Sequence, residues 1–240
     1  MNQIINLFDA YNIRVRFSAG LILISPIIIS VYLLVPNASN FSFTAIILVI
    51  CFGLCNLMMS LSRFWGRNVP SKCFSGLMPA QQLLMPDDET LDPITKKRYY
   101  KFLCSNVENL SFTKDIAIST NSCKSAVNWL ISQTRDSNKF PLIKEETINF
   151  GFSKTLYGLK PLGIVISLLL TIIEIIIVIA KINLKFNYIT YADIIAATIT
   201  SCIFTIIWIF FIKKEWVTYS GYKYAKTLLS ACDSDELSWQ

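Results

Sequence analysis

Four long apolar stretches dominate the pattern of hydrophobic and polar positions along the chain. Each comes close to the roughly 20 residues that a helix needs to cross about 30 Å of hydrocarbon. The stretches are residues 17–35, 41–61, 161–180 and 192–212. A secretory signal peptide explains the first stretch less well, because the run contains Ser25 and Pro26 and lacks a small-residue cleavage site. The pattern therefore predicts four transmembrane helices arranged as two hairpins.

The polar segment between the second and third apolar stretches has helical periodicity and little strand-like alternation. Asp92 followed by Pro93 is typical of an N-cap with proline at the first helical position, which predicts a helix from Pro93 to about Ser105. A further helix is predicted from Ile143 to about Tyr157, ahead of the third apolar stretch.

A third helix is predicted between these two. Asn121 or Ser122 can cap it, and it continues to about Thr134. Its apolar stripe consists of Ala126, Val127, Leu130 and Ile131. The insert is therefore expected to be a small α-helical domain.

The fold class that results is an all-α membrane protein with a small α-helical cytoplasmic domain inserted between transmembrane helices 2 and 3. Composition supports this class, because 53% hydrophobic residues, 16% charged residues and a mean hydropathy of +0.50 are too apolar for an ordinary soluble domain. The predicted segments are an N-terminus at 1–16, a transmembrane hairpin at 17–61, the inserted domain at 62–160, a second hairpin at 161–212 and a tail at 213–240.

The basic residues are distributed unequally between the two sides of the membrane. Two Lys or Arg residues precede the first span, fourteen lie between residues 63 and 160, and four follow the last span. Only Lys181 and Lys185 lie on the other side. Because cytoplasmic loops carry the excess of Lys and Arg, both termini and residues 62–160 are expected in the cytoplasm.

Residue types needed for common catalytic and metal sites are missing. The chain has no histidine, and its seven cysteines form no CxxC pair. Histidine-dependent nucleophilic sites and histidine metal sites are therefore excluded. The acidic cluster of Asp87, Asp88, Glu89 and Asp92 does not have the spacing of an EF-hand loop and is typical of a turn before a helix. We expect no enzymatic activity, no metal site and no cofactor.

The insert is basic, with 14 Lys or Arg and 9 Asp or Glu between residues 63 and 160. Cations next to aromatic rings are typical of sites for single-stranded nucleic acid or nucleotides. The candidate ligand-binding residues are Arg63, Arg67, Lys96, Lys97, Arg98, Tyr99 and Lys101. The alternative is that these charges reflect membrane topology and attraction to anionic lipids alone.

A carboxylate interrupts the third apolar stretch, ISLLLTIIEIIIVIA (166–180). Helical spacing places Glu174 on one face with Ser167, Thr171 and Lys181, and these four are the candidate pore-lining residues. Two interpretations remain open. Either Glu174 is protonated or hydrogen-bonded to a Ser, Thr or Asn inside one subunit, or several copies of it ring a water-filled pore shared between subunits.

Two other spans carry small and polar residues that suit close helix packing. In the fourth span they are Ala197, Ser201 and Thr205. In the second span they are Gly53, Asn56 and Ser60. The polar face of the third span is therefore expected to meet other spans and not lipid.

Two blocks of the insert carry a resemblance to known proteins. They are MPAQQLLMPDDETLDPITKKRYYKFL (78–103) and AVNWLISQTRDSNKFPLIKEETINFGFSKTLYGLKPLG (126–163). The blocks resemble four-span bacterial anti-phage membrane effectors, most closely the effector of the Hailong system, with effectors of cyclic-oligonucleotide systems and the Kiwa membrane subunit as neighbours. The resemblance implies a tetrameric channel of the bacterial inner membrane, whose cytoplasmic part binds a DNA oligomer made by a partner nucleotidyltransferase.

Together these features predict an oligomeric, ion-channel-like effector that a nucleotide or DNA oligomer gates through the basic insert. Opening would depolarise the membrane. The alternative is a membrane-anchored sensor or scaffold whose insert binds a protein partner.

Overall fold

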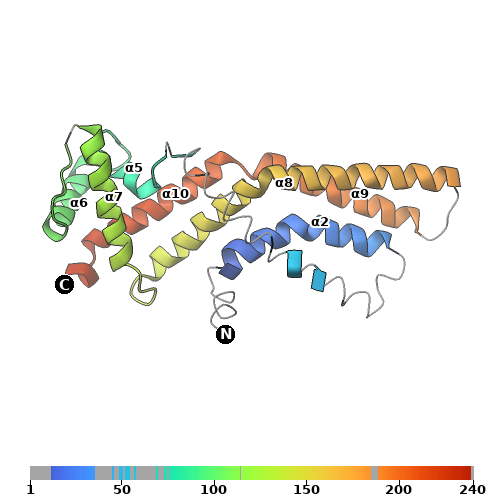
Figure 1. Ribbon diagram of the computed structural model, residues 1–240, viewed down its shortest axis with the longest axis horizontal. Coiled ribbons are helices and arrows are strands. Elements are labelled where there is room, and N and C mark those ends of the chain that lie inside the picture. The colour runs from blue at the N-terminus through green and yellow to red at the C-terminus, as the bar shows by residue number, and fades with distance from the viewer. Residues whose placement is uncertain are drawn as a thin grey trace. The chain divides into compact units, whose positions relative to one another are not determined.

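The structure is a computed structural model. It describes residues 12–35, 45, 49–50, 52–54, 57, 69, 73–74, 76–113, 115–184 and 189–238, and the regular elements within these ranges are all helical (Figure 1). The chain divides into two compact units. Unit 1 comprises Met1–Asn68 and Phe152–Lys213, and unit 2 comprises Val69–Gly151 and Lys214–Gln240.

Unit 1 contains the apolar helices. Its elements are the π-helix η1 (Asn12–Phe17), α2 (Ser18–Leu34), α8 (Pro141–Leu184) from Phe152 onward, α9 (Tyr191–Ile206) and the π-helix η2 (Ile207–Phe211). Three helical stretches are long and apolar enough to cross a membrane: Ile13–Leu34, Pro141–Leu184 and Tyr191–Phe211. The predictions of apolar helices over 17–35, 161–180 and 192–212 are therefore confirmed. Most of the predicted second span, 41–61, lies outside the described residues.

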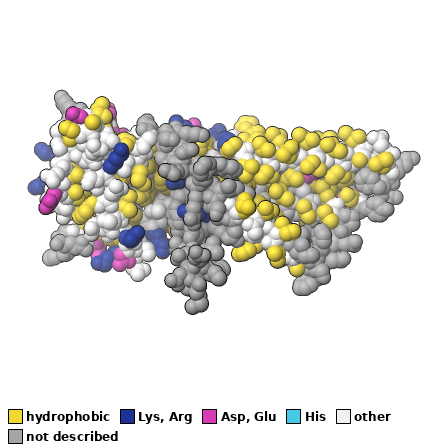
Figure 2. Space-filling model, in the orientation of Figure 1, with side chains coloured by type: hydrophobic (Ala, Val, Ile, Leu, Met, Phe, Trp, Pro, Cys, Tyr) yellow, Lys and Arg dark blue, Asp and Glu magenta, His cyan; other side chains and the backbone are white. Residues whose placement is uncertain are grey.

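Helices α2, α8 and α9 with η2 pack around one apolar core (Figure 1). The buried members of that core are Ala19, Leu23, Leu156, Leu159, Trp208 and Ile212. Large apolar side chains also cover the outer faces of α8 and α9 (Figure 2). Exposed apolar faces on helices of this length are typical of helices that contact lipid, so these helices indicate a membrane-embedded protein.

α8 is longer than the sequence predicts. A helix ending near Tyr157 and a separate span beginning at Pro161 were expected, but one helix continues through Pro161. Proline inside a helix costs about 3 kcal/mol, because it removes a backbone hydrogen bond and crowds the preceding turn. Packing of Leu156 and Leu159 in the core before the proline, and of buried Ser167 after it, keeps the helix continuous.

A tryptophan and a glycine approach each other closely in unit 1. Trp208 is fully buried, and a Cβ atom built on Gly163 would overlap its indole ring. Nearby, Lys160 Nζ donates to the carbonyl oxygens of Ile209 (3.1 Å) and Ile212 (2.8 Å). This lysine therefore satisfies carbonyl groups at the end of η2 that have no further helical turn to bond.

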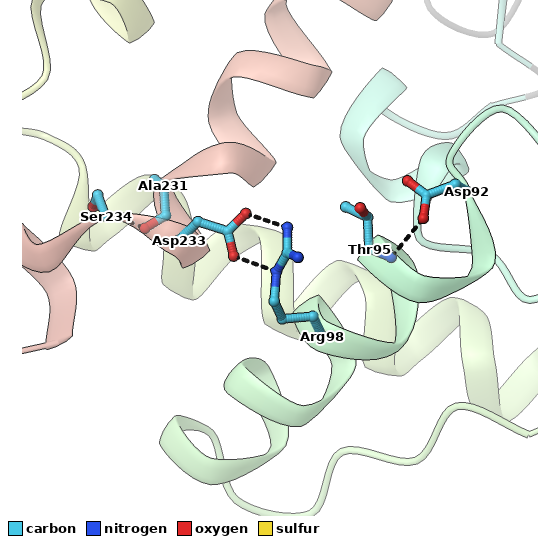
Figure 3. Close-up of polar contacts among 6 residues, drawn as sticks. All are labelled: Asp92, Thr95, Arg98, Ala231, Asp233 and Ser234. Atoms are coloured by element: carbon cyan, nitrogen blue, oxygen red, sulfur yellow. Dashed lines mark hydrogen bonds and ion pairs between the residues drawn. The ribbon is translucent and has the colours of Figure 1, made fainter.

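Unit 2 is a cluster of shorter helices. They are α5 (Pro79–Leu83), α6 (Pro93–Asn106), α7 (Ile116–Gln133), the first turns of α8, α10 (Lys214–Leu229), the 3-10 helix η3 (Ser230–Asp233) and α11 (Asp235–Ser238). The predicted helix from Pro93 is confirmed, and Asp92 Oδ1 accepts a hydrogen bond from the Thr95 backbone N–H at 2.8 Å (Figure 3). This hydrogen bond lowers the pKa of Asp92.

The predicted start of the next helix was wrong. α7 begins at Ile116, because Asp115 caps it by accepting hydrogen bonds from the backbone N–H groups of Ala117 (2.9 Å) and Ile118 (3.3 Å). The predicted apolar stripe is confirmed for its first three members, Ala126, Val127 and Leu130, which are fully buried.

The C-terminal residues belong to unit 2, whereas the sequence predicts a separate tail from residue 213. α10 packs on α5 and α7 and buries Val217, Ala225 and Leu228. At its centre, a Cβ atom on Gly221 would lie 2.5 Å from Cζ of buried Phe74, so this glycine permits the close packing of the two. An amphipathic helix of this kind is stable only when its apolar face is covered.

Candidate functional site

Glu174 connects three helices of unit 1. Its side chain is fully buried in α8, and its Oε1 atom accepts hydrogen bonds from Ser30 Oγ of α2 (2.7 Å) and Ser201 Oγ of α9 (2.9 Å). Both serines are buried as well. We call Ser30, Glu174 and Ser201 the carboxyl junction.

The second oxygen of the Glu174 carboxyl group, Oε2, takes no part in these two hydrogen bonds. Among the described residues Glu174 Oε2 has no hydrogen-bond partner, although it is fully buried. A buried polar atom without a partner costs free energy, so its surroundings are the first place to look for a ligand or water. The carboxyl junction is therefore a candidate ion site.

The other predicted pore-lining residues lie on α8 as expected but bond locally. Ser167 Oγ donates to Gly163 O (2.8 Å), and Thr171 Oγ1 donates to Ser167 O (2.9 Å). Lys181 is buried, donates to Ile189 O and lies 4.3 Å from the ring centroid of Tyr191. Of the two interpretations of Glu174, the hydrogen-bonded carboxyl inside one chain is the arrangement present here. The shared pore stays a prediction.

Three of the predicted ligand-binding residues, Lys96, Tyr99 and Arg98, are buried or make hydrogen bonds within unit 2. Lys96 is buried and donates to the carbonyl oxygens of Met85 and Asp88. Its burial lowers the pKa of the ammonium group, opposed by the charges of Asp88 and Asp87. Tyr99 is also buried, and that burial raises its pKa.

Arg98 forms a two-point ion pair with η3. Its Nε atom donates to Asp233 Oδ1 (2.6 Å) and its Nη2 atom to Oδ2 (2.7 Å) (Figure 3). This hydrogen bonding raises the pKa of Arg98. The guanidinium group therefore joins α6 to the C-terminal part of unit 2, and a phosphate would have to compete with Asp233 for two of its five N–H donors.

Lys97, Arg98 and Lys101 are the exposed members of the predicted cluster on α6, and Arg98 is paired with Asp233. Successive turns of a helix place residues four apart on one face, so the two ammonium groups form one small basic surface. Arg63 and Arg67 lie outside the described residues. The ligand-binding set stays a prediction, and its described and exposed part is Lys97, Lys101 and the ion-paired Arg98.

Unit 2 also contains a pocket that the sequence did not indicate. It has a volume of about 370 Å³ and is lined by Met85, Pro86, Asp87, Thr113, Ile116 and Ser119. Among the lining residues that the structure describes, Asp87 is acidic and none is basic, so the described part of the lining suits an apolar ligand better than a phosphate group.

The acidic turn before α6 has structural contacts. Asp88 Oδ1 accepts from the Thr90 backbone N–H (2.9 Å), and Asp92 caps α6. Within the described ranges, no group of three or more His, Cys, Asp or Glu side chains could hold a metal ion.

Sequence reasoning missed two partners in these sites. Ser30 was not selected, although its place in the apolar run of α2 marks it as a polar side chain that needs a bond. Asp233 was missed because it lies 135 residues from Arg98, and no local pattern connects the two.

Comparisons with models of protein families, with curated proteins and with solved structures found no match for the chain.

Proposed function

We propose that the chain is the subunit of an oligomeric ion channel in a bacterial inner membrane. Each subunit has four transmembrane helices, with both termini and residues 62–160 in the cytoplasm. The number of spans is supported by three apolar helices together with the apolar stretch at 41–61. The unequal distribution of Lys and Arg supports the orientation.

The observation that carries the proposal is the buried position of Glu174 among apolar spans. An ionisable residue in the middle of a span costs about 3 kcal/mol on insertion scales, and such residues usually mark ion or proton pathways. Ser30 and Ser201 bring polar atoms from two further helices to the same point. Polar groups from three helices around one carboxyl favour an ion pathway over a simple anchor.

The arrangement described here corresponds to a non-conducting state, because Glu174 is held inside one chain. In the conducting state the carboxyl junction opens and Glu174 faces a pore shared by four subunits. A ring of carboxylates favours cations over anions. A ligand shifts the equilibrium toward the conducting state only if it binds that state better than the non-conducting state.

The proposed ligand is a nucleotide or a single-stranded DNA oligomer from a partner nucleotidyltransferase. The basic composition of the insert supports this class of ligand, and Lys97 and Lys101 are the residues proposed to contact phosphate. The resemblance of residues 78–103 and 126–163 to the Hailong effector supports a role in anti-phage defence, in which opening depolarises the infected cell.

A second candidate function is favoured by the pocket of unit 2. Ile94, Ile116 and Leu142 of that unit are each more than two-thirds exposed, at 78%, 69% and 68%. Ile116 also lines the pocket, and exposed apolar side chains are typical of protein-binding surfaces. In this function the spans anchor a sensor or scaffold, and unit 2 binds a protein partner.

Conduction measurements separate the two functions. The purified full chain is placed in planar bilayers, and currents are recorded with and without a single-stranded oligodeoxyadenylate. A channel conducts, and Glu174→Gln reduces its cation preference, whereas Glu215→Gln, which removes an exposed carboxylate from α10, does not. Absence of current under all conditions, together with unchanged membrane potential in cells that overproduce the chain, would reject the channel.

A further inference from the structure

We infer that the carboxyl junction is a binding site for one monovalent cation, of which Na⁺ is the test case. Ser30, Glu174 and Ser201 provide its oxygen ligands. The inference goes beyond the proposed channel, because a single chain can hold this cation whether or not subunits assemble or conduct.

The first argument is the supply of ligands. Three oxygen-bearing side chains from α2, α8 and α9 converge, with Oε1 of Glu174 at 2.7 Å from Ser30 Oγ and 2.9 Å from Ser201 Oγ. Carboxylate and hydroxyl oxygens are hard ligands, which suit cations that have no preference for nitrogen or sulfur. Each hydroxyl donates its hydrogen to Oε1 and keeps lone pairs for a cation.

The second argument is the unused oxygen. Glu174 Oε2 is fully buried and has no partner among the residues that the structure describes. A proton on Oε2 would leave a buried O–H donor without an acceptor, which still costs free energy. A cation bound to Oε2 neutralises the carboxylate charge and gives Oε2 a partner in place of the missing hydrogen bond.

The third argument is the amount of charge. Within the described part of unit 1 the acidic residues are Glu174 and Asp193. Asp193 caps the start of α9, where its carboxylate accepts a hydrogen bond from Thr190 Oγ1 at 2.6 Å. The carboxyl junction therefore offers one negative charge, which one monovalent cation neutralises. A divalent ion would leave a net positive charge in an apolar surrounding, at a high cost.

The test measures binding of radioactive sodium to the purified full chain in detergent, with choline to hold ionic strength constant. We expect one Na⁺ per chain in the wild type and none in Glu174→Gln. Ser30→Ala and Ser201→Ala, which remove only a hydroxyl group, should each weaken binding at least about tenfold, as is usual for groups that support a metal site. Thr200→Ala, which removes a hydroxyl of α9 that bonds to Ala196 O in its own helix, should bind as the wild type does.

A second measurement keeps the inference testable if Glu174→Gln does not fold. A carbodiimide adds to a protonated buried carboxyl group to give a stable N-acylurea, which mass spectrometry locates. Na⁺ in the site should slow the labelling of Glu174 in the wild type, and the effect should be weaker in the two serine variants. Labelling at the same rate in Na⁺ and in choline, or Na⁺ binding that persists in Glu174→Gln, would overturn the cation site. Since neither measurement involves conduction, loss of the channel function would leave this result unchanged.

Discussion

The indole ring of Trp208 occupies the space that a Cβ atom on residue 163 would need. Gly163 is therefore the residue that allows η2 to approach α8 this closely. Trp208 is fully buried and belongs to one core cluster with Ala19, Leu23 and Leu159, so a shift of the ring disturbs that core.

Gly163→Ala should destabilise unit 1 by about 1–3 kcal/mol, the usual cost of overpacking a core. Thermal unfolding of the chain in detergent measures the loss. Gly53→Ala is the matched control, because a Cβ atom there meets no described atom within 4 Å. Combining Gly163→Ala with Trp208→Phe should restore part of the stability, since the smaller ring leaves room for the methyl group. Equal melting temperatures for Gly163→Ala and the wild type would show that the contact is not tight.

Arg98 and Asp233 should act as one structural pair. Both side chains are partly exposed, so removing either one should lower the stability of unit 2 only slightly. Arg98→Gln and Asp233→Asn should therefore have similar small effects, and the double variant should be no less stable than either single variant. Chemical denaturation of the wild type, the two single variants and the double variant gives the coupling free energy between the two side chains. Additive losses would mean that the two residues do not depend on each other.

Lys97 and Lys101 should carry the salt-dependent part of oligonucleotide binding. Replacing both by Gln should weaken binding of an oligodeoxyadenylate and reduce the slope of log affinity against log salt by about 1.4, since each phosphate contact on a single strand contributes about 0.7. Lys124→Gln with Lys144→Gln removes the same charge from exposed positions on α7 and α8. If both double variants lose affinity equally, the lysine pair of α6 is not a site and only overall charge matters.

The thiol of Cys123 should make unit 2 less stable at alkaline pH. Burial raises the pKa of Cys123 to about 11, whereas the thiol of the unfolded chain ionises near 9.0. The pKa of Cys123 is higher in the folded chain than in the unfolded chain. The contribution of this thiol to the free energy of unfolding is therefore complete below pH 9 and is lost as the pH rises from 9 to 11. At pH 10 the loss is about 1 kcal/mol.

Unfolding of the wild type and of Cys123→Ala should therefore be compared between pH 8 and pH 10. The variant should lose less stability than the wild type over this range, whatever its stability at pH 8. Cys104→Ala is the control, because that thiol is exposed. A pH dependence shared by all three proteins would assign the effect to other groups.

Much of the fold follows from local patterns in the sequence. The apolar runs are long enough to define three of the helices, and Asp92 with Pro93 fixes the start of α6 because a side-chain cap and a missing N–H act within one turn. The start of α7 was missed because several residues before its apolar stripe can cap a helix. Asp115 is the residue that caps the helix in the structure, and Ser119 Oγ donates to Thr113 O beside it, but the sequence pattern does not single out either contact.

The sites depend on contacts between distant residues and were predicted less completely. The position of Glu174 inside an apolar run showed that it needed a partner, and the small residues of α9 pointed to Ser201. Nothing in the spacing connected Glu174 to Ser30, which lies 144 residues earlier. Likewise, Lys96 and Lys97 look equivalent in the sequence. Only the fold shows that one lysine is buried against carbonyl groups and the other is exposed.

The two lysines that bracket the apolar part of α8 act as markers of membrane depth. Lys160 and Lys181 are 21 residues apart, which is about 31 Å along a helix and matches a hydrocarbon layer of about 30 Å. Charged side chains at span ends stay near the interface, so these positions fix how deep the residues between them lie. Glu174 is about 10 Å from the level of Lys181 and about 21 Å from that of Lys160. An ion that approaches from the Lys181 side therefore has half the distance to cover.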